Sequence, residues 1–505
     1  MRMKALGFLA ALLGFVLLSA APAKAEWRRA ESPNFIVYST QSEAQLRQRI
    51  LLLEDYDRLL RRMISVTEPP APNKLHIYIV DGIEDLQLIR PVPATTAGMY
   101  EASADGIAAF VDDSTAMSGN EILFHEYAHH FMLQYRPNAY PVWYVEGFAE
   151  YFMTARFSPS RIEIGDYSSA RSGAIRFGEW LPMERILNGD LRGLNDEQRA
   201  QFYAQAWLTV HYFYSTPERQ AALARYLVAL RGADPANAIR TATGMDAAAF
   251  GREISHYVGS GHVDYWRMPR PAGEAEPPVT VTVMPRGAGD LMLYEAALRV
   301  GIGDDKGRLY LPRIRAAAAR HEGDPFAQRV LAHAELLYGD PAAADRLLDG
   351  LLAASPNDAE LLYLKGLRHL RAAEHAENGS AEAAEARRWF GRAHQADPNH
   401  FQTLYRYAQT FRNDPGYVSD NNIEVILLAH QLAPQVSEIT LNAAAMLIAH
   451  RDNAIAIALL RPLAADPHDA ELAQAARQMI ERAQADAPAH PAPAPSQPPP
   501  APRPN

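Results

Sequence analysis

The sequence predicts a mixed α+β domain followed by an all-α solenoid of paired helices. Three observations carry this prediction. Strand and helix signals alternate from residue 27 to about 113, and the pattern is mainly helical from 119 to about 259. Beyond a Pro-rich stretch, the chain repeats a helix–turn–helix unit. A chain of 505 residues is too long for one ordinary core, so several domains are expected.

Residues 1–25 have the features of an export signal. "MRMK" is a basic n-region, "ALGFLAALLGFVLLSA" is an apolar h-region, and Ala23-Lys24-Ala25 matches an A-x-A cleavage site. Cleavage before Glu26 removes three positive charges and takes the formal net charge from −10 to −13. An uncleaved membrane anchor is the alternative, but the apolar run is short for a bilayer span. We therefore expect a mature protein with no membrane span.

Composition narrows the class of protein and its location. The 48% hydrophobic and 21% charged content is typical of a folded soluble protein. A net charge of −10 argues against nucleic-acid binding, which needs a basic face. The absence of cysteine rules out a lipidated cysteine anchor and argues against a disulfide-bonded animal secreted protein. A periplasmic or secreted bacterial protein is the expectation.

The first domain is expected to span residues 26–266. "NFIVYST" and "KLHIYIV" read as strands, and "SEAQLRQRILLLEDYDRLLRRMI" between them has helical periodicity. "AGMYEASADGIAAFVDDS" predicts two strands joined by a turn at Asp105-Gly106. "NEILFHEYAHHFMLQY", "VWYVEGFAEYFMTARF" and "NDEQRAQFYAQAWLTVHYFYST" predict helices. Residues 158–194 look irregular, as either a cover over a cleft or a long connection.

Residues 267–289 are Pro-rich and predict a linker, after which residues 290–485 form the predicted solenoid. Proline punctuates this region at spacings of 31, 42, 36 and 33 residues, beginning at Asp324-Pro325 and ending at Asp466-Pro467. In period and in Ala/Leu texture the region resembles tetratricopeptide repeats, whose helix pairs stack because no pair can bury its apolar face alone. An irregular helical bundle is the alternative. Residues 486–505 are Ala/Pro-rich and predict a disordered tail.

The stretch "FHEYAHHF" contains the pattern His-Glu-x-x-His. Positions i and i+4 lie on one face of a helix, so His125 and His129 can both face one metal ion. Zinc accepts neutral imidazoles and, in catalytic sites, keeps one position for water. Glu126 lies beside that position and can act as general base on the zinc-activated water. His130 points about 100° away around the helix and is expected to be structural.

A catalytic zinc usually takes a third protein ligand, and the next predicted helix offers two acidic candidates. Glu146 and Glu150 are also four residues apart, on one helical face. One can bind the ion while the other supports a ligand histidine. Gly147 between them is expected to let this helix approach the His-Glu-x-x-His helix closely.

"HEYAH" followed by "WYVEGFAEYF" resembles the gluzincin metallopeptidases, and the whole is most similar to peptidase-MA-like bacterial proteins. The resemblance covers about residues 30–260 and is strongest in 121–152. It implies a zincin-like catalytic fold with one Zn²⁺ per chain, held by His125, His129 and Glu146. It also implies that Glu126 is the catalytic base and Glu150 the acid behind the ligands. The strand "GIAAFVD" would be the sheet edge along which an extended substrate lies.

The resemblance also implies a hydrogen-bond donor to the oxyanion on a later helix. Tyr203 is the preferred candidate because "FYAQAW" resembles related families, and His211 is the weaker one; both can equally be core aromatic residues. The metzincin pattern is excluded, because Met132 and Tyr135 stand where it requires glycine and histidine. "GMYEA" at 98–102 does not fit the Gly-x-Met-x-Asn motif of aminopeptidases, so an endopeptidase is expected.

Two functions follow from these patterns. The first is an exported zinc metallopeptidase that cleaves a peptide or protein substrate, with repeats that bind substrate or a protein partner. The alternative is a non-enzymatic envelope adaptor that acts through its repeats, with an inactive zincin core. A purely structural zinc site is disfavoured because such sites prefer four ligands and cysteine.

Overall fold

The computed structural model describes residues 26–485 except 95, 115–118, 168, 232, 260–264 and 467–468. The predicted export signal and the predicted C-terminal tail lie outside these residues. None of the helices in the described part of the chain combines the length and the hydropathy that a bilayer span requires.

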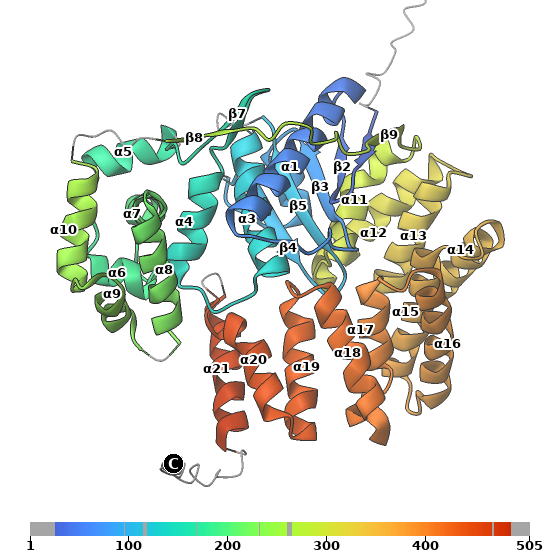
Figure 1. Cartoon of the computed structure of the whole chain (residues 1–505). Helices are drawn as coiled ribbons and strands as arrows, with labels where there is room; N and C mark the ends of the chain where they lie inside the picture. Colours follow the sequence, from blue (N-terminus) through green and yellow to red (C-terminus); the bar gives the residue numbers. More distant parts are fainter. Residues whose placement is uncertain are drawn as a thin grey trace, which may run out of the picture.

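A six-stranded sheet forms the centre of the molecule (Figure 1). In spatial order its strands are β4 (Gly98–Ala102), β5 (Ile107–Asp112), β3 (Leu75–Val80), β2 (Phe35–Ser39), β1 (Arg28–Glu31) and β9 (Thr280–Val283). Strands β2, β3 and β5 are parallel, whereas β4, β1 and β9 run antiparallel to their neighbours. The expectation that "GIAAFVD" forms the sheet edge is wrong. Those residues form β5, and the hairpin at Asp105-Gly106 adds β4 outside it.

Helices cover both faces of the sheet, and the strand side chains alternate between two apolar cores. From β3, Ile77 and Ile79 join the core with α1 (Glu43–Met63) and α3 (Gly119–Tyr135). Tyr78 belongs to the opposite core, which contains α2 (Ile83–Ile89) and α11 (Ala288–Arg299). The first helices of the repeat region therefore complete the second core of the sheet.

The predicted linker takes part in both sheets. β8 (Trp266–Pro269) pairs with β7 (Arg161–Ile164), which pairs with β6 (Arg156–Phe157), to give a small three-stranded sheet. β9 closes the large sheet by pairing with β1. Residues 267–289 are thus not only a spacer, because their backbone hydrogen bonds pair them with two strands of the first region.

The remaining helices of the first region pack beside the sheet (Figure 1). They are α4 (Val142–Phe152), α5 (Ser169–Phe177), α6 (Met183–Asn188), α7 (Asp196–Tyr214), α8 (Pro217–Ala229), α9 (Pro235–Thr243) and α10 (Ala247–Tyr257). The stretch that looks irregular in sequence thus contains β7, α5 and α6. Helix α7 starts with a capping box in which Asn195 and Gln198 satisfy each other's backbone N–H groups.

Among the described residues, the repeat region contains five helix pairs and a final helix. The helices are α11, α12 (Asp304–Ala319), α13 (Pro325–Tyr338), α14 (Pro341–Ala354), α15 (Ala359–His375), α16 (Ser380–Ala396), α17 (Phe401–Gln409), α18 (Asp420–Leu432), α19 (Ser437–His450), α20 (Asn453–Ala464) and α21 (Ala470–Ala485). A short 3₁₀ helix, η1 (Pro415–Val418), separates α17 from α18. Each punctuating proline among the described residues follows the second helix of a pair, so the predicted helix–turn–helix units are present; Pro467 lies outside the described residues. Proline suits this place because it cannot continue a helix.

Candidate metal centre

Helix α3 supplies the His-Glu-x-x-His residues. His125 and His129 are one turn apart on it, and their Nε2 atoms lie 3.1 Å from each other. Both side chains are mostly buried, with 19% and 13% exposed. His130 faces elsewhere: it is buried, and its Nδ1 pairs with the Tyr100 hydroxyl at 3.0 Å. His125 and His129 therefore share one site, whereas His130 belongs to the protein interior.

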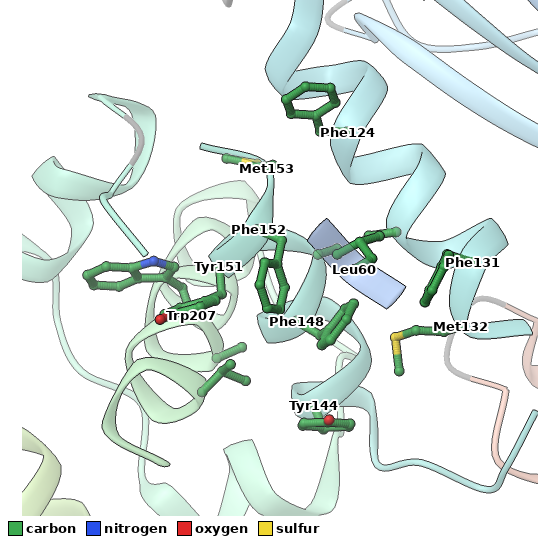
Figure 2. Close-up of a cluster of buried hydrophobic side chains, with 14 of the residues drawn as sticks. Leu60, Phe124, Phe131, Met132, Tyr144, Phe148, Tyr151, Phe152, Met153 and Trp207 are labelled. Atoms are coloured by element: carbon green, nitrogen blue, oxygen red, sulfur yellow. The ribbon is translucent and has the colours of Figure 1, made fainter. Parts of the chain in front are cut away.

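Helix α4 places two carboxylates opposite these histidines. Aromatic residues fix it, because Phe148 and Phe152 pack in a core with Phe131 of α3 and Trp207 of α7 (Figure 2). Glu146 leaves the helix toward the histidines although it is only 1% exposed. A carboxylate buried this deeply needs compensating partners. The apolar packing of α4 thus holds a charged group in place rather than letting it reach solvent.

Three atoms form the centre of the site. The Oε2 atom of Glu146 lies 3.7 Å from Nε2 of His125 and 3.7 Å from Nε2 of His129. With 3.1 Å between the two nitrogens, the centre of this triangle is about 2.0 Å from each corner, which suits zinc bonds of about 2.0–2.2 Å. Two imidazoles and a carboxylate are also a donor set that zinc accepts. His125, His129 and Glu146 could therefore hold a metal ion.

Glu150 lies one turn beyond Glu146 and has a different partner. Its carboxylate accepts two hydrogen bonds from Arg171 of α5, at 3.0 Å from Nε and 2.7 Å from Nη2. Its Oε1 atom also lies 3.7 Å from Nδ1 of His125, on the side of that ring away from the triangle. Burial raises the pKa of Glu150, and Arg171 opposes this shift. Sequence reasoning missed Arg171, which lies in a stretch without a motif.

The two oxyanion candidates on α7 lie in different surroundings. Tyr203 lines the same cleft as His125, Glu126, His129 and Glu146. Burial, reinforced by the negative charge of Glu146, raises its pKa to about 12, so the phenol keeps its proton at neutral pH. His211 is 1% exposed, its Nδ1 pairs with the Tyr257 hydroxyl at 2.9 Å, and it is not among the residues that line the cleft.

Edge strand β4 lies against α3 beside the site. A Cβ on Gly98 would lie 2.4 Å from a side-chain carbon of Ile122, so only glycine permits this close approach. The same position is 3.9 Å from Cγ of Glu126. Tyr100 and Glu101 of β4 line the cleft together with Glu126. The strand that forms the sheet edge is therefore also a border of the site.

Gly147 serves a different contact from the one expected. A Cβ there would lie 2.4 Å from the carbonyl oxygen of Ala206 and 2.7 Å from Cγ2 of Val210, both on α7. The expected close approach to α3 is therefore wrong, since the missing side chain makes room for α7. The reason is the periodicity of the helix. The face of α4 that carries Glu146 toward α3 is not the face that carries Gly147.

Comparisons with known proteins match the repeat arrangement alone. No protein-family model matches the chain, and no curated protein matches it. A thermophilic TPR protein of Thermus thermophilus (TTC0263) is 16% identical, with 39% of this chain and 99% of that chain covered and a TM-score of 0.33. The ArsTM double mutant of MamA RS-1 is 18% identical, with coverage of 40% and 97% and a TM-score of 0.26. These scores are below 0.5, so the assignment of helical repeats rests on the helix pairs themselves.

Proposed function

We propose that the protein is an exported zinc-dependent metallopeptidase, and that it cleaves peptide bonds within polypeptide chains. The observation that carries this proposal is the triangle of His125, His129 and Glu146, all three of which line an open cleft of about 800 Å³. Glu126 and Tyr203 line the same cleft. The repeats are proposed to bind the substrate or a protein partner.

The chemistry assigns a role to each group. A zinc ion bound by the three ligands would supply Lewis-acid polarisation of the scissile carbonyl and of the attacking water. Glu126 takes a proton from that water as its oxygen bonds to the carbonyl carbon. The same carboxyl then gives the proton to the leaving nitrogen as the C–N bond breaks. Hydrolysis thus consumes one water and leaves Glu126 as it began.

Two further residues support this assignment. The protonated phenol of Tyr203 can donate a hydrogen bond to the oxygen on which negative charge develops, and such a preorganised donor lowers the energy of the transition state. Glu150, fixed by Arg171, lies 3.7 Å from Nδ1 of His125 and would orient that ring on a small approach. The unpaired outer side of β4 supports backbone hydrogen bonding to an extended substrate, since no other described strand pairs with it.

Metal content and proteolysis together test the proposal. Purified mature protein should contain about one zinc ion per chain when its metal content is measured by inductively coupled plasma mass spectrometry. The Glu146→Ala variant should lose this zinc, because two histidines alone do not complete a catalytic site. Glu126→Gln should keep the zinc and lose the cleavage of unfolded casein. A wild type without zinc after repletion, or Glu126→Gln with full activity, would overturn the proposal. Zinc without cleavage would favour the adaptor function.

A further inference from the structure

The cleft above the metal triangle has a second wall that belongs to the repeat region. Helices α18 to α21 face α3 across it, and Figure 1 shows these last helices running below the sheet and α4. Leu459 and Pro462 of α20 and Leu472 of α21 line the cleft from this side. The metal triangle therefore lies in a cleft between two regions of the chain. The residues opposite it on α20 and α21 are more than 300 positions later in the sequence.

Helix α20 lines the cleft with apolar residues, whereas the rest of the second wall also contributes polar ones. Leu459, Pro462 and Leu472 are only partly buried, and exposed Leu133 of α3 lines the cleft from the opposite side. Pro462 also has no backbone N–H, so the helical hydrogen bond to the Ala458 carbonyl, on the same wall, is missing. The wall thus offers apolar surface on α20, which suits an apolar side chain.

The repeat region holds the hairpin that carries the edge strand. The β4–β5 turn contains Asp105, whose carboxylate pairs with Arg406 of α17 at 2.8 Å and whose carbonyl accepts from Gln402 at 3.2 Å. Ala104 is 1% exposed within the core of the last repeats. A Cβ on Gly106 would lie 2.4 Å from the carbonyl of Arg299 at the end of α11. Strand β4 and the repeats are consequently parts of one packed unit.

The second wall also contacts α3 directly. Gln435, between α18 and α19, donates to the side-chain oxygen of Gln134 at 2.6 Å. Asn73, before β3, donates to the carbonyl of Leu432 at 3.2 Å. Together with the hairpin contacts, these bonds fix the spacing between the edge strand, the metal triangle and the second wall.

The size of the cleft limits what fits between the walls. About 800 Å³ corresponds to a cube about 9 Å on a side, whereas a folded domain of 100 residues has a radius of gyration of about 13 Å. A folded domain is excluded, but one more strand needs only about 4.8 Å beside β4. Glu101, Asp466 and Asp469 also line the cleft. The negative charge of these residues argues against an acidic occupant of the cleft.

We infer that helices α18–α21 are a fixed specificity wall, which admits extended segments of unfolded polypeptide and binds an apolar side chain between Leu133 and Leu459. This inference rests on the proposed peptidase function for its biological meaning. The binding itself needs no catalysis. It can therefore be tested on a variant that does not cleave.

The experiment measures binding with zinc-loaded Glu126→Gln protein. The probe is fluorescein-labelled ribonuclease A, either native or reduced and alkylated, so that the two forms share one sequence and differ in fold and in their alkylated cysteines. Fluorescence anisotropy should show binding of the unfolded probe alone. Adding Leu459→Asp should raise Kd at least about tenfold, the factor expected when one buried leucine contact is lost. Ile455→Asp is the matched control: Ile455 is on α20, 50% exposed and not among the cleft residues, so Kd should change less than twofold.

The outcomes separate the wall from the peptidase. Equal binding of native and unfolded probe, no binding of either, or equal effects of Leu459→Asp and Ile455→Asp would overturn the specificity wall. Cleavage of casein by the wild type, measured in parallel, tests the catalytic proposal alone. Selective binding without wild-type cleavage would support the wall and contradict the peptidase. Wild-type cleavage together with an unchanged kcat/KM in Leu459→Asp would support the peptidase and contradict the specificity wall.

Discussion

Replacing Arg171 with methionine should show how much Arg171 stabilises the buried carboxylate of Glu150. Arg171 donates two charge-assisted hydrogen bonds to Glu150, which is 1% exposed. Met keeps most of the apolar stem but removes both bonds. The carboxylate must then remain charged without its partner or take up a proton, and either change costs free energy in the folded state.

The size of this effect follows from the burial of the pair. Breaking a buried ion pair by removing one partner typically costs about 3–5 kcal/mol. Since the Arg171 side chain is 22% exposed, water relieves part of the penalty, and about 3 kcal/mol is the expected loss of unfolding free energy. Adding Glu150→Gln to Arg171→Met removes the charge and should recover most of that loss.

Urea unfolding at pH 8, followed by tryptophan fluorescence with EDTA present, measures these free energies without the metal contribution. A change below about 0.5 kcal/mol in Arg171→Met would refute the argument, because that is the size of an ordinary surface substitution. A double variant as unstable as the single one would also refute it, because the loss would then not come from an unpaired charge.

Three further predictions concern chemistry, packing and pH. Tyr203→Phe should lower kcat on casein by roughly 10²–10³ while zinc content stays unchanged, and an unaltered kcat would remove the phenol from the mechanism. Gly147→Ala should destabilise the protein by about 3 kcal/mol because its Cβ meets the Ala206 carbonyl, whereas Gly350→Ala, with no neighbour within 4 Å, should raise the melting temperature; equal shifts would contradict the packing. Burial lowers the pKa of His76 to about 3, so its stabilising contribution is complete above pH 6.5 and is lost as pH falls toward 3. With EDTA present, a change from pH 7 to pH 5 should lower the unfolding free energy of the wild type by about 1 kcal/mol more than that of His76→Gln, after allowance for the partial exposure of His76. Equal losses in the two proteins would contradict the lowered pKa of His76.

Local patterns predicted much of the fold and the residues of the site. Helical spacing alone puts His125 beside His129 and Glu146 beside Glu150, since residues four apart share a helix face. The punctuating prolines marked the ends of the helix pairs because proline interrupts the helical hydrogen bonds. These features depend on the nearest turns of the chain, so a single sequence is sufficient to reveal them.

Contacts between elements that are distant in the chain could not be predicted from the sequence. The order of strands decides that β4 and not β5 forms the edge, and periodicity within a strand carries no information about its neighbours. Arg171 reaches Glu150 only because α5 packs against α7, which in turn packs against α4. Gln134 and Gln435, bonded at 2.6 Å, are 301 residues apart, and neither lies in a recognisable motif. The second wall of the cleft therefore becomes visible only in the folded chain.

The most direct test of the central claim is the rate at which zinc-loaded Glu126→Gln hydrolyses unfolded casein, relative to zinc-loaded wild type. Removing the general base while the ligands His125, His129 and Glu146 stay intact should lower kcat/KM by at least about 10²-fold, the usual contribution of acid–base catalysis. Equal rates for the two proteins, each with one bound zinc, would show that the cleft residues do not carry out peptide hydrolysis.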